Sequence, residues 1–180
     1  MTLTPKPDNV SIAQPEDEDE LYDILSQELF NENGTFSLSE RKGRGFIRET
    51  VNKMNYGIIG VIREEGSIAA TIGMTLGTFW YSDDWHVEEY WNFVRCDYRK
   101  SIGTENKRSN YAHDLINFAK WYSERMELIL NIGIISTKHT EAKCRLYGRI
   151  LVPVGQFFMH NLHLAKGPGI QKIEGKNYGQ

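Results

Sequence analysis

The chain has 180 residues, of which 40% are hydrophobic and 12% aromatic, so it can fill the core of one compact domain and global disorder is excluded. Its 21 basic and 24 acidic residues give a net charge of −3, which does not indicate a broad nucleic-acid-binding surface. Cys96 and Cys144 form no CxxC pair and the five histidines show no HxxxH spacing, so we expect neither a disulfide framework nor a metal site.

The composition along the chain predicts one folded domain with two loose ends. Residues 1–9 are poor in apolar side chains and are expected to be a flexible leader, and residues 165–180 are rich in Gly and Lys and are expected to be a flexible tail. Residues 10–164 are expected to form the domain. No signal-peptide pattern and no apolar stretch of about 20 residues is found, which predicts a soluble, cytoplasmic protein without a membrane segment.

Hydrophobic periodicity predicts the elements in the order β-α-α-β-β-β-α-β-α-β. In chain order the expected elements are a strand at 10–13, helices at 16–30 and 39–55, strands at 56–63, 67–81 and 85–96, a helix at 109–125, a strand at 128–135, a helix at 140–147 and a strand at 155–161. Turns are expected at 31–34, at Glu65–Gly66 and at 82–84. The fold class is therefore α/β: an α+β mixed sheet with helices on both faces.

Two of these elements carry further expectations. The apolar run Leu128–Ile135 is typical of a strand that is covered on both faces. Strict alternation along 85–96 would place Glu88 on one face with Tyr90, Asn92 and Val94, and Glu89 on the other.

The segment from Glu88 to Ala112 is the most informative part of the sequence. A strand there leads through a polar, basic loop into a helix, an arrangement in which free backbone N–H groups and the helix dipole bind phosphate. Side chains in the loop would add positive charge: Arg99, Lys100, Lys107 and Arg108.

This segment resembles motif A of the GNAT (Gcn5-related) N-acetyltransferases. Val94 and Tyr98-Arg99 match the first half of that motif, and Asn110-Tyr111-Ala112 match its closing G-x-A, with about eight residues inserted between them. The Asn would suit a turn that needs left-handed backbone geometry. A second register places the motif wholly at Lys107-Arg108-Ser109-Asn110-Tyr111-Ala112. Whether Arg99 or Lys107 leads the pyrophosphate loop stays open.

The resemblance extends over about residues 10–161. The strand, helix and strand expected at 128–135, 141–147 and 155–160 follow the order in which GNAT domains end, and residues 12–17 resemble their first strand and helix start. The style of the sequence is also similar to phage-encoded members. The resemblance therefore implies a GNAT acyltransferase fold and acetyl-CoA as co-substrate, without a metal.

The same resemblance implies roles for individual residues. In such enzymes the fourth strand splays from the fifth, and a backbone N–H of the fourth strand, here in Phe93, Val94 or Arg95, polarises the thioester. Glu88 is close to the usual position of the general base, and Tyr147 corresponds to the tyrosine that protonates the departing thiolate. The expected cofactor-binding residues are Phe93, Val94, Arg95, Arg99, Lys100, Lys107, Arg108, Ser109, Asn110, Tyr111 and Ala112.

The acceptor and the partners stay open. A set of aromatic residues clusters at the third and fourth predicted strands, half of it core by alternation and the rest able to line an acceptor cleft or a homodimer contact: Phe79, Trp80, Tyr81, Trp85, Tyr90 and Trp91. Basic residues of the second helix would suit an acidic or phosphate-bearing acceptor: Arg41, Arg44, Arg48 and Lys53.

Three readings of the function follow from the resemblance. The first is transfer of an acetyl group to an amine of a small molecule, a protein or a nucleobase. The second is a nucleobase- or nucleic-acid-modifying enzyme of phage type, acting in the host cytoplasm. The third is a non-catalytic binding protein of the same fold, which the degenerate motif A favours and the presence of Glu88 and Tyr147 disfavours.

Overall fold

A computed structural model describes residues 3–33, 36–99, 110–134 and 140–154. The strand expected at 155–161 and the tail expected at 165–180 lie outside these residues. The chain divides into two compact units, one built from Met1–Tyr22 and Arg44–Gly133 and the other from Asp23–Gly43 and Ile134–Gln180.

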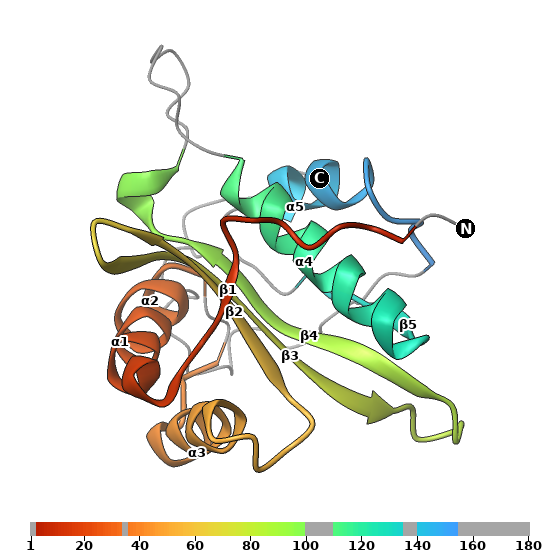
Figure 1. Cartoon of the computed structure of the whole chain (residues 1–180), viewed down its shortest axis with the longest axis horizontal. Helices are drawn as coiled ribbons and strands as arrows, with labels where there is room; N and C mark the ends of the chain where they lie inside the picture. The colour runs from red at the N-terminus through yellow and green to blue at the C-terminus, as the bar shows by residue number, and fades with distance from the viewer. Residues whose placement is uncertain (1–2, 34–35, 100–109, 135–139, 155–180) are drawn as a thin grey trace, which may run out of the picture. The chain divides into compact units, whose positions relative to one another are not determined.

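The first unit contains a five-stranded sheet in the order β1-β2-β3-β4-β5 (Figure 1). The strands are β1 (Ser11–Ile12), β2 (Ile58–Glu64), β3 (Ser67–Thr78), β4 (Trp85–Val94) and β5 (Ile129–Asn131). Neighbours pair antiparallel from β1 to β4, and β5 runs parallel to β4. With helices on both faces of this mixed sheet, the predicted fold class is confirmed.

Helix α4 (Tyr111–Met126) covers one face of the sheet (Figure 1). Its Leu115 and Phe118 are fully buried and pack in one core cluster with Ile72 and Met74 of β3. A Cβ on Gly60 of β2 would lie 2.7 Å from the Phe118 ring, so the glycine provides the space that this ring occupies. Close packing of this kind fixes the position of α4 on the sheet.

The opposite face is covered by α1 (Glu18–Asp23) and α3 (Glu40–Val51) (Figure 1). Leu21 of α1 and Ile47 of α3 are fully buried. Helix α3 ends at Val51, earlier than the sequence indicated, because Lys53 adopts a left-handed backbone (φ 57°) that stops the helix.

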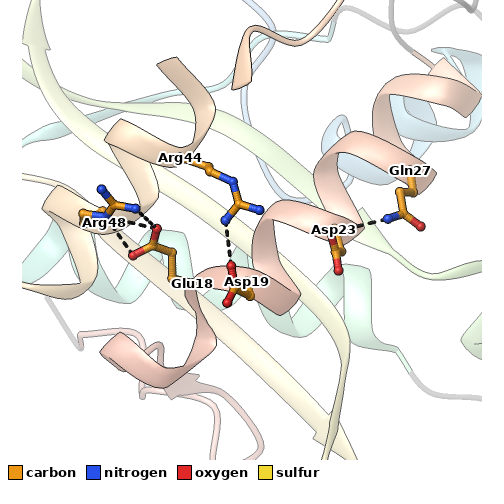
Figure 2. A network of polar contacts seen from close by, with 6 residues as sticks. All are labelled: Glu18, Asp19, Asp23, Gln27, Arg44 and Arg48. Atoms are coloured by element: carbon orange, nitrogen blue, oxygen red, sulfur yellow. Dashed lines mark hydrogen bonds and ion pairs between the residues drawn. The ribbon is translucent and has the colours of Figure 1, made fainter. Parts of the chain in front are cut away.

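Ion pairs join the helices of this face (Figure 2). Glu18 of α1 accepts from Arg48 of α3 through both carboxylate oxygens, at 2.6–3.1 Å, and Asp19 accepts from Arg44 at 2.7 Å. The hydrogen bonds from Arg48 hold the pKa of the Glu18 carboxyl below its ordinary value. Two of the basic side chains considered for an acidic acceptor are therefore engaged by carboxylates of the protein.

The first helical stretch is longer and less regular than the sequence indicated. It comprises a short 3₁₀ turn η1 (Pro15–Asp17), then α1, a π-helical segment η2 (Ile24–Leu29) and α2 (Phe30–Asn33). The turn expected at 31–34 is wrong at residues 31–33, which are helical. The start is capped, because Gln14 N–H donates to the Asp17 carboxylate at 2.8 Å.

The hairpin of β2 and β3 is confirmed. Glu65 and Gly66 both have positive φ (51° and 89°), the backbone that a two-residue turn between twisted strands requires. Strands β3 and β4 each end a few residues before the predicted limit.

The prediction for residues 128–135 is wrong in length and in burial. Strand β5 has three residues, and Ile129 is 74% exposed. Leu128 and Leu130 pack against the core cluster under α4, whereas Ile129, which points to the other face, is exposed, so only one face of the run is covered.

Residues 3–9 contain no helix or strand, but Thr4 is held by α4. Its backbone N–H and its hydroxyl donate to the Glu124 carboxylate at 2.5 and 2.8 Å. These bonds lower the pKa of Glu124.

The second unit contains η2, α2 and α5 (Thr140–Tyr147). The bounds of α5 are those predicted. Helix α5 is followed by a tight turn, in which the Tyr147 carbonyl accepts hydrogen bonds from the N–H groups of Ile150 and Leu151 at 3.0 and 2.7 Å.

Candidate functional site

A β-bulge in β4 shapes the candidate site. Met74 of β3 pairs with Glu89 and the preceding Gly73 pairs with Trp91, so Tyr90 is an extra residue in β4. A bulge of this kind bends the strand and interrupts the alternation of its side chains. The extra residue, Tyr90, lies two positions after the expected base, Glu88.

The bulge overturns one prediction about Glu88. Glu89 pairs with Met74, and Asn92 with Ile72, two residues of the core cluster under α4. Side chains directly opposite each other share a face, so Glu89, Asn92 and Val94 lie on the α4 face. Glu88 lies on the opposite face, and its predicted grouping with Asn92 and Val94 is wrong.

Trp91 closes the bulged region from the α3 side. Its ring crosses Gly73, where a Cβ would come within 2.3–2.5 Å of three ring carbons. Its Nε1 donates to Thr71 Oγ1 at 3.3 Å, and its ring meets Phe46 of α3 edge-on at 5.7 Å. The extra residue, Tyr90, also contacts Phe46, at 4.9 Å between ring centroids.

The Glu88 side chain lies in a small polar and aromatic environment. An added Cβ on Gly77 would lie 3.6 Å from Glu88 Oε2 and 3.9 Å from His86 Nε2, so both side chains lie over the same glycine. Burial, and secondarily the Glu88 charge, raise the pKa of the Tyr90 hydroxyl. A carboxylate on a face lined by His86 and Tyr90 is a suitable acceptor for a proton.

Strands β4 and β5 are paired only at the start of β4. The pairing covers His86–Glu88 and stops where the bulge begins, so residues 89–94 of β4 have no strand partner on this side within the described part of the chain. The start of this separation coincides with the position of Glu88.

The phase of the β3–β4 ladder shows which backbone groups face the open side. Arg95 N–H donates to the Ala69 carbonyl of β3 at 3.0 Å. Successive residues of an antiparallel strand direct their N–H groups to alternate sides. Phe93 therefore bonds toward β3, and Val94 directs its N–H and carbonyl away from β3. Of the three predicted residues Phe93, Val94 and Arg95, only Val94 offers its N–H to the side of β5.

Arg99 and Arg95 fold back onto the end of β4. Arg99 Nε donates to the Val94 carbonyl at 2.6 Å, and its guanidinium lies 4.9 Å from the Phe93 ring centroid. Arg95 reaches the Ile68 carbonyl at 3.4 Å. The structure thus gathers Phe93, Val94, Arg95 and Arg99 at one corner of the sheet.

The predicted phosphate-binding helix starts close to its expected position. Asn110 precedes α4, and its carbonyl accepts from Asp114 N–H at 2.9 Å. Its φ of −79° contradicts the expected left-handed geometry, so asparagine is not needed there for that reason. Tyr111 donates its hydroxyl to Glu64, and Ala112 is half-buried. Lys100, Lys107, Arg108 and Ser109 lie outside the described residues, so the two registers of motif A stay open.

The expected acid, Tyr147, is the last residue of α5 in the second unit and is 7% exposed. Among the described residues, no group of three or more His, Cys, Asp or Glu side chains could hold a metal ion. No helix in that part of the chain is long and apolar enough to cross a membrane.

Sequence reasoning missed His86, which was considered with the other histidines only as a possible metal ligand. It is 4% exposed, its ring stacks on Phe79 at 4.3 Å, and its Nδ1 has no hydrogen-bond partner among the described residues. The available signal was its spacing of two from Glu88, which places both side chains on one face of β4.

The structure is similar to several acetyltransferases of known structure. It matches a ribosomal-protein-alanine N-acetyltransferase from Brucella melitensis biovar Abortus 2308 with a TM-score of 0.57 and 12% identity, over 84% of this chain and 98% of that one. It matches the aminoglycoside antibiotic 6'-N-acetyltransferase AAC(6')-IG from Acinetobacter haemolyticus with a TM-score of 0.59 and 13% identity, over 85% and 98%.

A third match is a predicted acetyltransferase from Clostridium acetobutylicum, whose structure contains acetyl-CoA; the TM-score is 0.58 at 12% identity, over 88% of this chain and 98% of that one. No family model matches the sequence, and no curated protein matches it. The chain therefore has the fold of the GNAT acetyltransferases, as the resemblance in its sequence implied.

Proposed function

We propose that the protein is an N-acetyltransferase that moves an acetyl group from acetyl-CoA to an amine. The observation that carries this proposal is the separation of β4 from β5 directly after Glu88, at the bulge, in a chain with this fold. An extended ligand that lies along the β5 side of β4 beyond Glu88 would bring a reacting group next to Glu88.

In the proposed reaction the amine nitrogen attacks the thioester carbon by direct transfer. Val94 N–H hydrogen-bonds the carbonyl oxygen as negative charge develops on it. Glu88 takes the proton that the amine must lose. The C–S bond breaks, and the CoA thiolate takes a proton from the Tyr147 hydroxyl. The start of α4 and the basic loop before it would bind the pyrophosphate.

The proposal places the enzyme in the cytoplasm. The described residues include two cysteines, Cys96 and Cys144; both are exposed and neither forms a disulfide. Exposed thiols that are not oxidised to disulfides are typical of a reducing compartment.

The test is calorimetric titration of the protein with acetyl-CoA, with desulfo-CoA and ATP as controls. Micromolar binding of the CoA compounds, and not of ATP, supports the proposal. No binding at millimolar acetyl-CoA refutes it and leaves a non-catalytic binding protein of this fold.

Deletion of Tyr90 tests the role of the bulge. The residues on either side of Tyr90 already pair in a regular ladder, so the deletion leaves every other side chain of β4 on its present face. The fold should survive, but a straighter β4 could follow β5 further and close the site. We expect acetyl-CoA binding to fall at least tenfold, whereas Tyr90→Phe, which keeps the bulge and the ring contact with Phe46, retains it. Equal binding by both variants would show that the bulge does not form the site.

Replacement of Glu88 tests the base. Glu88→Gln should lower kcat about 10²-fold or more and remove the acidic limb of the pH–rate profile. Glu64→Gln is the matched control. Glu64 is a carboxylate of β2 that accepts a hydrogen bond from Tyr111 of α4, and its replacement should retain that limb. An unchanged profile in Glu88→Gln would exclude Glu88 as the base.

A further inference from the structure

The hairpin between β3 and β4 carries a continuous series of aromatic contacts that leads away from Glu88. His86 stacks on Phe79 (4.3 Å), Phe79 stacks on Tyr81 (5.4 Å) and Trp80 meets Tyr81 edge-on (5.5 Å). We call His86, Phe79, Tyr81 and Trp80 the aromatic strip. It begins beside Glu88, because His86 and Glu88 lie over the same glycine, Gly77.

Exposure rises along the strip. His86 is 4% exposed, Phe79 41%, Tyr81 68% and Trp80 95%. Side chains that serve packing alone are usually buried. The exposure of Trp80 and Tyr81, at the end of a strip that continues into the buried His86, is therefore unusual. The buried His86 Nδ1, which has no partner among the described residues, leaves a polar atom available at the inner end.

The hairpin segment that carries the strip has charges of one sign only. Residues 79–90 contain four carboxylates and no Lys or Arg, and two of these carboxylates, Asp83 and Asp84, are exposed in the turn that follows Trp80 and Tyr81. Aromatic faces next to carboxylates attract ammonium groups through the ring quadrupole and through charge. An anionic acceptor would be repelled there, and Arg44 and Arg48 are already bonded to Asp19 and Glu18 (Figure 2).

We infer that the aromatic strip binds a second cationic group of the acceptor, so that the preferred substrate is a small organic dication whose one amine reaches Glu88 while its other ammonium rests on Tyr81 and Trp80. This inference rests on the proposed function and adds the acceptor class to it. The strip sets the distance between the two amino groups of the substrate. One amine lies at Glu88 and the other at Tyr81, so they are separated by the stacked rings of His86 and Phe79.

The experiment compares hexamethylenediamine with aminohexanol, which has the same chain length and a neutral hydroxyl in place of one ammonium. We expect kcat/KM to favour the diamine by about tenfold, the value for one cation on two aromatic faces. Trp80→Leu and Tyr81→Leu should reduce this preference to about threefold or less. Trp80→Phe, which keeps an aromatic face, should retain most of it.

Two controls separate the inference from the proposed function. Asp8→Asn removes an exposed carboxylate outside the hairpin and should leave the preference unchanged. Calorimetric titration with each amine alone measures the strip without turnover, and the diamine should bind more tightly to the native protein than to Trp80→Leu. Equal kcat/KM or equal binding for the two amines overturns the inference, even where acetyl-CoA binds and turns over. Absence of acetyl-CoA binding refutes the proposed function and leaves the amine titration to decide the strip.

Discussion

The contact between Gly73 and Trp91 gives a stability prediction that depends on the bulge. In Gly73→Ala the new Cβ would lie 2.3 Å from the nearest Trp91 ring carbon, far inside van der Waals contact. The ring is 8% exposed, so it cannot yield without moving its neighbours or breaking its bond to Thr71. Overpacking and the loss of one buried hydrogen bond together should lower the free energy of unfolding by about 3 kcal/mol.

The assay is urea denaturation, in which a loss of this size lowers the midpoint by about 1.5 M for a chain of this length. Gly45→Ala is the matched control, because an added Cβ in α3 meets no atom within 4 Å. It should stabilise the protein by about 0.5–1 kcal/mol through helix propensity.

A double-mutant cycle makes the cause specific. Trp91→Leu removes the ring and should itself cost about 3 kcal/mol. In that background Gly73→Ala should be close to neutral, so the two changes should couple by about 2 kcal/mol or more. A native-like midpoint for Gly73→Ala, or an equal cost in both backgrounds, would refute the contact between Trp91 and Gly73.

Three further predictions address other parts of the molecule. Because Arg48 lowers the pKa of Glu18, their pair stabilises the fold above the ordinary glutamate pKa and stops doing so as pH falls through the lowered one. Arg48→Met should therefore lower the urea midpoint more at pH 7 than at about pH 3. Gly66→Ala should cost about 1 kcal/mol by the same assay although the space is empty, because φ there is 89°. Tyr147→Phe should lower kcat about 10²-fold with little change in the calorimetric Kd for acetyl-CoA, whereas a collapse of Kd would assign it a structural role.

The parts of the fold that were predictable from the sequence are those that local patterns determine. The apolar spacing of α4, the left-handed pair Glu65–Gly66 and the bounds of α5 each depend on a few neighbouring residues. The end of α3 was misplaced because Lys53 has no evident preference for a left-handed backbone. The burial of β5 was misjudged because an apolar run does not by itself show that other elements cover both faces of the strand.

The candidate site was predictable in composition but not in geometry. The sequence identified Glu88 and the end of β4, yet period-two alternation assigned the wrong neighbours to Glu88. The error has one source, the extra residue Tyr90, and a bulge has no sequence pattern of its own. The available signal was Gly73, since an isolated glycine in a strand often marks a bulge or a close approach by another group. In the structure Gly73 marks both.

The bulge also connects the two halves of the proposed reaction. Up to Glu88, β4 is a regular strand paired on both sides, which fixes Glu88 and His86 rigidly over Gly77 and next to the aromatic strip. Beyond Tyr90, β3 is the one strand partner of β4 within the described residues, so Val94 can direct its N–H to a bound ligand instead of to β5. Without the bulge β4 could still carry Glu88, but nothing in its geometry would end its pairing with β5 between Glu88 and Val94. In the proposed reaction, the single inserted residue thus lets one strand hold the proposed base, Glu88, before the bulge and the proposed oxyanion donor, Val94 N–H, after it.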